Sequence, residues 1–458
     1  MKKSRLYILV TTVAMLAFSS CSEFLDQKPS KSIVVPESLE DLQSLLNTVD
    51  LVNAGDSFGL LLSDDLFTTD EGWRGFGENI QMGYIWNKQL SNAEGSMPSW
   101  SIAYSNIFKF NVVLEEANSI VLKNAEEQEY LNRIRGTALF LRSYHYFELL
   151  QLFTHPILSK ADLDRAGIPM PLVPDFTEPL GNARLGDVYS QIIGDLQLAT
   201  DLLPESPSDP LRPSKVAGMG MLAKVYLQLG EYETALQQAE QALAIKSTLM
   251  DFNSIPDLEN IPIPLYSYAI PRFNEEVVIQ LLAGSQSYMF SELTFVNQEV
   301  YDSYDSTDIR KYLFFNEPDQ EGRVNFLGSF SGDYLLFSGI STGELFLIKS
   351  ECLARLGRDS EAVETLNTLL EKRHYSGTFV PLEPGDEPVL KKVLAERRKE
   401  LVYRGITRWT DMRRFLRDQE WQGVDPRVVE GIVYDLGTEP EDYVLEFPLN
   451  EQLRNDAL

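Results

Sequence analysis

Apolar side chains between positions 217 and 245 recur at intervals of three and four on both sides of Gly230. This spacing predicts two amphipathic helices joined by a tight turn at the glycine. The second helix would carry Ala235, Ala239 and Ala242 on one face. Because these side chains are small, a neighbouring helix can approach that face closely. The stretch therefore predicts one closely packed pair of helices.

Residues 346–373 repeat this pattern, with Gly357 at the place of Gly230 and Ala362 at the place of Ala235. The spacing Ala-x2-Tyr-Leu-x2-Gly-x-Tyr-x2-Ala-x3-Ala of the first copy is typical of a tetratricopeptide helix pair. Such pairs cannot bury their apolar faces alone, so we expect them to stack into a curved helical scaffold.

Two further helices are predicted before these pairs. The segments from Trp100 to Ile120 and from Arg133 to Phe153 place aromatic residues at helical spacing. Taken together, the patterns predict a mostly α protein built on a tetratricopeptide-like scaffold of helix pairs.

Helical spacing is lost in residues 251–340. Residues 261–273 are rich in Pro and Tyr, residues 275–284 have the composition of a short strand, and residues 322–337 mix aromatics with Gly and Ser. We expect an irregular, loop-rich insertion that contains short β-strands. A similar irregular stretch is predicted at residues 64–99. Loops held by a rigid scaffold are common binding sites, so both stretches are candidates.

The start of the chain has the features of a bacterial lipoprotein signal. Residues 1–5 carry three cations, residues 6–18 are apolar, and two serines precede Cys21. Cleavage before a cysteine that then receives acyl chains requires this order, and the apolar run is too short to span a bilayer as a helix. We expect residues 1–20 to be a signal peptide and Cys21 to be the site of lipid attachment. The alternative is ordinary secretion with a chance cysteine.

The charge of the chain narrows the set of partners. Lys and Arg number 40, Asp and Glu number 68, and the formal net charge is −28. Nucleic acid is a poor partner for such a chain, because binding phosphates requires a basic surface. Anionic lipid head groups would also repel the acidic body. We therefore expect contact with the membrane through the lipid anchor only.

The sequence predicts neither a cofactor nor a metal site. Cys352, the second cysteine, lies in an apolar helical pattern, which favours a buried side chain over a reactive thiol. His145, His155 and His374 include no pair at i, i+4. Binding of a Ca²⁺ ion by the acidic residues at 302–308 stays open, although these residues lack the spacing of an EF-hand.

Four motifs follow one another along the chain. They are CSEFLDQKP from Cys21, the pattern W-x3-Y-x2-I-x3-N from Trp100, the helix pair at Gly230, and ERRKELVYRGITRWTDMRRF from Glu396. In order and spacing they resemble the SusD/RagB family of outer-membrane lipoproteins from Bacteroidetes, and the resemblance covers nearly the whole chain. The chain departs from the family pattern at Arg404, where the family usually has a Glu.

This resemblance implies a binding protein without enzymatic activity. Members of the family lie as a lid on a SusC-like TonB-dependent outer-membrane transporter and capture glycans, or sometimes peptides, for import. By resemblance we expect the same location and the same partner here, with the protein facing the cell exterior. Peptide binding within the same family stays open as an alternative.

The predicted organisation has four segments. Residues 1–20 are the signal peptide, and residues 21–250 form an N-terminal helical scaffold with a ligand loop near residues 64–99. Residues 251–340 form the loop-rich insertion. Residues 341–458 form a C-terminal helical region with the last helix pair and the C-terminal motif.

Neutral sugars present C–H faces and hydroxyls, so they require exposed aromatic platforms with polar groups at the rim. Trp73 lies in a glycine-rich segment, with Arg74 and Asn79 as polar neighbours. We predict that these residues bind ligand; the alternative is that Trp73 folds back as a local plug. The other predicted ligand-binding aromatics, each of which could instead belong to the core, are Tyr266, Tyr268, Tyr288 and Tyr334.

Other aromatic and charged residues are predicted to be structural. We expect Trp86 and Trp100 in the core. In the C-terminal motif around Trp409, we expect Arg413 or Arg414 to pair with Glu396 or Glu400 as a structural lock.

Two other classes of function stay open at this point. A helical glycoside hydrolase on the cell surface would require two carboxylates at the correct separation. A tetratricopeptide adaptor would bind protein partners on its concave helical face.

Overall fold

The structure of the protein is a computed structural model. It describes residues 36–49, 54–90, 98–175, 180–207, 209–255, 269–284, 286–385, 387–418 and 421–455. The predicted signal peptide and Cys21 lie outside the described residues, as do Tyr266 and Tyr268.

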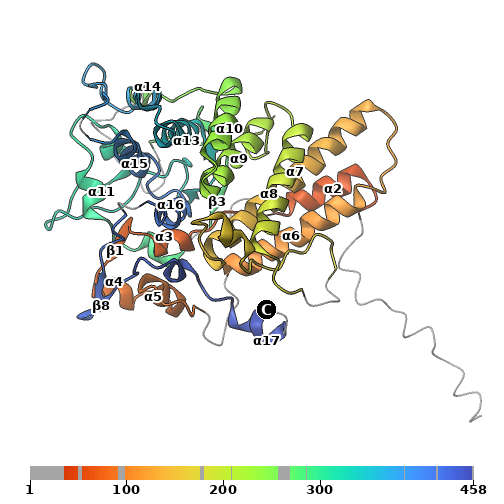
Figure 1. Ribbon diagram of the computed structural model, residues 1–458, viewed down its shortest axis with the longest axis horizontal. Coiled ribbons are helices and arrows are strands. Elements are labelled where there is room, and N and C mark those ends of the chain that lie inside the picture. The colour runs from red at the N-terminus through yellow and green to blue at the C-terminus, as the bar shows by residue number, and fades with distance from the viewer. Residues whose placement is uncertain are drawn as a thin grey trace, which may run out of the picture.

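Helices that pack against one another in succession form the frame of the molecule (Figure 1). Along the chain, α6 packs on α7, α7 on α8, α8 on α9, α9 on α10, α10 on α13 and α13 on α14. The longer helices are α2 (Leu39–Asn47), α6 (Pro98–Glu116), α7 (Ala125–Phe153), α8 (Leu185–Leu202), α9 (Lys215–Leu229), α10 (Tyr232–Ile245), α13 (Thr342–Arg355), α14 (Asp359–Leu370), α15 (Val389–Glu400) and α16 (Thr407–Phe415).

Both predicted helix pairs are confirmed. Gly230 separates α9 from α10 at φ 77°, and Gly357 separates α13 from α14 at φ 73°. This left-handed conformation costs glycine little because glycine has no Cβ atom. Ala235 and Ala239 are completely buried on α10, on the face predicted to receive a neighbouring helix.

Short elements occupy the two regions predicted to be irregular. Residues 64–99 differ from the prediction, because they contain a strand and two short helices despite their glycines. The insertion agrees with the prediction, since the strands among its described residues span only two or three residues. The short helices are α3 (Phe58–Leu62), α4 (Asp70–Arg74), α5 (Glu78–Tyr84), α11 (Gln298–Asp302), α12 (Arg310–Phe314) and α17 (Leu449–Arg454). The 3₁₀ turns are η2 (Lys160–Asp164), η3 (Phe252–Ser254), η4 (Ser287–Phe290) and η5 (Pro440–Tyr443).

Antiparallel strand pairs join parts of the insertion to one another and join the insertion to β1 (Leu66–Thr68). Strand β1 pairs with β4 (Thr294–Val296), β2 (Val277–Ile279) with β6 (Ile340–Ser341), and β3 (Leu282–Ala283) with β5 (Leu336–Phe337). A separate hairpin joins β7 (Arg427–Val429) to β8 (Ile432–Tyr434). The pairing of β1 with β4 brings residues near position 67 beside residues near position 295.

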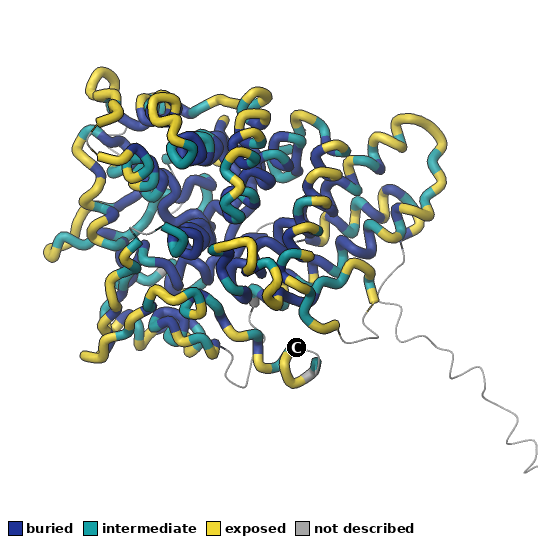
Figure 2. The backbone as a smooth tube through the Cα atoms, viewed as in Figure 1, coloured by how far each residue is buried: buried dark blue, intermediate teal, exposed yellow. Residues whose placement is uncertain are grey.

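The core runs through the helical frame and continues into the insertion, whose buried residues belong to the same cluster (Figure 2). The predictions for Trp86, Trp100 and Cys352 are confirmed, because their exposed fractions are 8%, 4% and 0%. Trp409 is also buried and donates a hydrogen bond from its Nε1 to the carbonyl of Gln151, at 2.9 Å. In the described ranges, no helix combines the length and the hydrophobicity that a membrane span requires.

Candidate functional site

A cavity of about 350 Å³ lies between β1, the residues after β4, the helices α15 and α16, and the segment that leads into β7. We call it the Phe67–Trp421 cavity. Its volume falls at the small end of the range of about 300–1,000 Å³ that is usual for ligand sites. Its lining residues are Asp64, Leu66, Phe67, Thr68, Tyr84, Trp86, Asn297, Glu299, Arg398, Arg408, Trp421, Gly423, Val424, Asp425, Pro426, Arg427 and Val428.

The pairing of β1 with β4 builds one wall of this cavity. Phe67 lies opposite Phe295, with ring centroids 5.4 Å apart, and the backbone amide of Asn297 donates to the carbonyl of Asp65 at 2.8 Å. These contacts hold Phe67 beside Asn297 and Glu299 at the start of α11. Residues from distant parts of the sequence therefore share one surface.

Two arginines of the cavity are neutralised by the aspartates beside them. Arg408 Nε lies 2.6 Å from Asp64 Oδ1, and Arg398 contacts Asp64 at 2.9 Å and Asp65 at 3.1 Å. Burial disfavours the charged form of Asp64, but the guanidinium groups of Arg408 and Arg398 outweigh it and hold its pKa well below the usual range. Burial dominates at Asp65 and raises its pKa. The lining therefore offers no strong excess of positive charge to an acidic ligand.

Aromatic rings and polar groups both line this cavity. Phe67 and Trp421 are half-buried, and the indole ring of Trp421 lies 5.4 Å from Phe415 and 5.6 Å from the guanidinium carbon of Arg408. Asn297, Glu299 and Asp425 supply hydrogen-bonding groups. Apolar ring faces beside such groups match the C–H faces and hydroxyls of a neutral sugar.

Arg427 joins Tyr84 and Trp86, which also line the cavity, to the backbone before β1. Its guanidinium carbon lies 4.3 Å from the centroid of Tyr84 and 4.2 Å from that of Trp86. The same group donates to the carbonyl of Leu61 at 3.0 Å and to the carbonyl of Ser63. Burial lowers the pKa of Arg427 to about 10, so the group stays charged at neutral pH.

The residues predicted around Trp73 lie outside the residues that line this cavity. Trp73 is half-buried on α4 and packs against the core, and its Nε1 donates to the carbonyl of Gln81 at 3.1 Å. Arg74 is exposed and pairs with Glu430 at 2.6 Å. Asn79 is half-buried on α5. Their contact with a ligand stays a prediction.

The tyrosines predicted in the insertion have different surroundings. Tyr288 is completely buried and donates its hydroxyl to the carbonyl of Ser57 at 2.6 Å, so here it serves packing. Tyr334 is 53% exposed. Phe67 and Trp421 were not predicted from the sequence. Trp421 stands six residues after the motif that ends at Phe415, and a search for tryptophans beside that motif would have found it.

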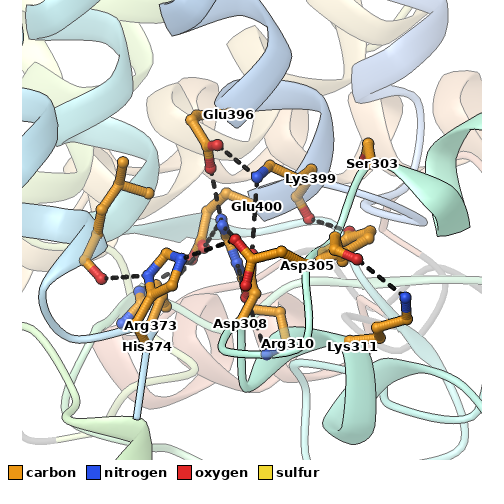
Figure 3. Close-up of polar contacts among 12 residues, drawn as sticks. Ser303, Asp305, Asp308, Arg310, Lys311, Arg373, His374, Glu396, Lys399 and Glu400 are labelled. Carbon is orange, nitrogen blue, oxygen red and sulfur yellow. Dashed lines mark hydrogen bonds and ion pairs between the residues drawn. The ribbon is translucent and has the colours of Figure 1, made fainter. Parts of the chain in front are cut away.

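A buried network of charged side chains shares helix α15 with the cavity (Figure 3). Arg310, which is completely buried, pairs with Asp308 at 2.7 Å, Glu396 at 2.7 Å and Glu400 at 3.1 Å. Arg373 pairs with Glu400 at 2.9 Å. Since each of these carboxylates is held by a cation, the network fixes geometry rather than supplying a free acid or base. It also engages Asp308, the last residue of the acidic stretch considered for Ca²⁺.

The predicted partners of Arg413 and Arg414 were wrong. Arg414 pairs with Glu351 on α13 and, at 2.9 Å, with Asp411. Arg413 donates to backbone carbonyls, including that of Thr154 at 2.7 Å. Glu396 and Glu400 are instead neutralised by Arg310, which the sequence places in the distant insertion.

A second, smaller cavity of about 40 Å³ is lined by Asp56, His145 and Glu148, among others. The backbone amide of Asp56 donates to Glu148 Oε2 at 2.7 Å, and the hydroxyl of Tyr144 donates to Glu148 Oε1 at 2.7 Å. Burial raises the pKa of Glu148 to about 8 and lowers that of His145 to about 4. The space would hold a few water molecules but not a sugar ring. These carboxyls are therefore poorly placed to act on a glycan.

Comparison with known proteins gives matches to two family models. A model described as "Starch-binding associating with outer membrane" matches residues 23–227, and a model described as "SusD family" matches residues 340–443.

Three individual proteins illustrate the likeness. The SusD-like protein P2 of Formosa agariphila is 24% identical over 99% of this chain and 98% of its own. A SusD superfamily protein of Bacteroides thetaiotaomicron is 21% identical, with a TM-score of 0.72 over 92% of this chain and 98% of its own. A laminarin-binding SusD-like protein is 17% identical, with a TM-score of 0.63 over 91% of this chain and 98% of its own.

Proposed function

The chain belongs to the SusD/RagB family, and on that premise we propose that it is a cell-surface lipoprotein that binds oligo- or polysaccharides and delivers them to a partner TonB-dependent outer-membrane transporter. The observation that carries the binding part is the composition of the Phe67–Trp421 cavity. There, two half-buried aromatic rings lie beside uncharged and acidic hydrogen-bonding groups, and Arg398 and Arg408 are already paired with Asp64.

The ligand class follows from this composition. Ring faces favour the C–H face of a pyranose, and Arg398 and Arg408, which are paired with aspartates, offer little to a sulfate or uronate. The net charge of −28 also disfavours acidic polysaccharides. The match described as starch-binding and the laminarin-binding structural relative make starch and laminarin the first polymers to test.

Location and partner rest on the start of the sequence and on the family. The order of residues before Cys21 supports lipidation, and the family description supports association with the outer membrane. The test of delivery to a SusC-like transporter is to extract the lipidated protein from outer membranes in mild detergent and purify it. Co-purification of a large integral membrane protein would support this part. A protein that purified alone under those conditions would oppose this part.

Substitution of the cavity aromatics tests the proposed site. Trp421→Ala and Phe67→Ala each remove a stacking face, and such a contact contributes about 0.5–1.5 kcal/mol beyond the buried area. We expect each variant to bind a starch or laminarin hexasaccharide about three- to tenfold more weakly, measured by titration calorimetry.

The matched control is Tyr312→Ala, which removes an exposed aromatic that does not line the cavity. Thermal unfolding of each variant shows whether weaker binding comes from the missing side chain or from loss of the fold. Trp73→Ala is measured in parallel. If Trp73→Ala alone abolished binding while both cavity variants kept it, the site would lie at α4 instead. A peptide that bound in the cavity in place of every glycan would favour the alternative of peptide binding within the family.

A further inference from the structure

Exposed aromatic side chains are rare among the described residues. Among these residues, the exposed aromatic side chains are those of Phe273, Tyr312 and Tyr334, with exposed fractions of 38%, 43% and 53%. A scattered surface aromatic has no special meaning, but aromatics that gather at one place do. Phe273 and Tyr334 lie on two loops that contact each other.

Three contacts hold these loops together. Gly332 lies so close to the backbone of Arg272 that a Cβ atom at position 332 would be 2.2 Å from the Arg272 nitrogen. The side chain of Asn274 donates to the carbonyl of Phe330 at 3.3 Å. Gln280 Nε2 donates to the carbonyl of Ser331 at 2.9 Å. Segments 272–274 and 330–333 therefore form one local surface.

Polar side chains lie next to both exposed rings. Arg272 Nη1 lies 3.9 Å from Asp333 Oδ2, and its guanidinium carbon lies 4.8 Å from the centroid of the Phe273 ring. The backbone amide of Tyr334 donates to Asp333 Oδ1 at 2.7 Å. The side chains of Arg272 and Asp333 are 47% and 23% exposed, so both reach solvent. The surface thus has two exposed aromatic side chains with a donor and an acceptor beside them.

The backbone of Phe273 is unusual in a way that points to function. Its φ is +56°, a left-handed conformation that is rare for a bulky residue. Such conformations cost free energy and occur preferentially at functional sites. Phe273 combines this backbone conformation with a large apolar side chain that is partly exposed to water.

We propose that Phe273 and Tyr334 form a second carbohydrate-binding platform, which takes a neutral pyranose unit of a polysaccharide already held by the Phe67–Trp421 cavity. The ring faces would stack on the sugar, while Arg272 and Asp333 would bond its hydroxyls. This inference rests on the proposed glycan-binding function and extends it to polymers.

The platform is separate from the cavity. None of its four residues is among the described residues that line the cavity. The strand that follows Tyr334, β5, pairs with β3, which Figure 1 places near the middle of the molecule, whereas β1 and β8 lie at its left edge. Two separated sites on one chain bind a long polymer more tightly than a short oligosaccharide, because the second contact becomes intramolecular.

The test compares polymer with oligosaccharide. The Phe273→Ala/Tyr334→Ala double variant is run through native gels that contain laminarin or soluble starch, and its affinity for the corresponding hexasaccharides is measured by calorimetry. We expect the apparent affinity for the polymer to fall at least about tenfold. The affinity for the hexasaccharide should stay within about twofold of the wild-type value.

Tyr312→Ala serves as the control, because it removes the third exposed aromatic, and its mobility in the polymer gel should be that of the wild-type chain. Unchanged retardation of the double variant would overturn the platform and leave the cavity proposal intact. An equal loss for polymer and hexasaccharide would also overturn it, because the two rings would then belong to a single site. If the wild-type chain bound neither polymer nor hexasaccharide, both proposals would fail.

Discussion

The pKa of Glu148 shows how strongly the surroundings of a buried carboxyl control its protonation. It lies on α7 among apolar residues, accepts hydrogen bonds from the Asp56 amide and the Tyr144 hydroxyl, and has a pKa raised by burial to about 8. Sequence patterns predicted the part of α7 from Arg133 to Phe153, although the helix begins at Ala125, but they gave no sign of this environment, because Asp56 lies 92 positions away from Glu148. The same limit explains the wrong partners predicted for Arg414, whose carboxylate Glu351 lies 63 positions away.

The raised pKa of Glu148 makes stability depend on pH. Between about pH 4.5 and 8 the unfolded chain releases this proton while the folded protein keeps it, so the free energy of unfolding falls as pH rises. The fall is up to about 1.4 kcal/mol per pH unit. Glu148→Gln can keep a hydrogen bond to each neighbour without a charge to bury. Between pH 5 and 8 the free energy of unfolding should fall in both proteins. We expect the fall to be smaller by a few kcal/mol in the variant than in the wild-type chain.

Urea denaturation at pH 5, 6, 7 and 8 measures this difference. Glu364→Gln on α14, where the carboxyl is exposed, is the control and should leave the pH dependence as it is. An identical pH dependence in Glu148→Gln and the wild-type chain would contradict the assigned protonation.

At the scale of elements, local patterns predicted the helix pairs but not the pairing of strands that are distant in the sequence. The three-and-four spacing and a glycine that can take positive φ specify α9–α10 and α13–α14 locally. Strand β1 has only three residues and its partner β4 lies in the insertion, so no local period indicates that the two pair. Because this pairing builds a wall of the Phe67–Trp421 cavity, the cavity could not be predicted from the sequence either.

A buried ion pair between Glu351 and Arg414 joins α13 to α16. Arg414 donates to Glu351 Oε2 at 2.8 Å, and Arg355 donates to Glu351 Oε1 at 2.8 Å. Burial disfavours the charged form of Glu351, but these guanidinium groups outweigh it and lower its pKa to about 2. Arg414→Met would leave a buried carboxylate short of its main partner. We expect it to lower the free energy of unfolding by about 3–5 kcal/mol.

Arg358→Met removes the exposed pair with Glu361 at the start of α14 and is the matched control, with an expected cost below about 1 kcal/mol. Chemical denaturation with an unchanged m-value measures both variants. Similar small costs for the two arginines would show that Arg414 does not hold α16 against α13.

At the scale of the whole molecule, the helical frame carries a surface assembled from four distant parts of the chain. Strand β1, the start of α11, helices α15 and α16, and the segment before β7 all contribute to the cavity. The buried network around Arg310 and Arg373 ties the insertion to α15, so the insertion is fixed relative to the frame. A rigid, preformed site of this kind loses little entropy when a ligand binds. The fold class could be predicted from the sequence, whereas the arrangement of this surface required the packed structure.

Calorimetric titration of the chain from Ser22 onward against neutral glycans, acidic glycans and peptides, with product analysis of each mixture, tests the central claim most directly. The account predicts saturable binding of a neutral oligosaccharide, weak or absent binding of acidic glycans, and recovery of the glycan intact. Release of shorter sugars by the pure protein would contradict the assignment as a binding protein, and preference for acidic glycans would contradict the ligand class inferred from the paired arginines.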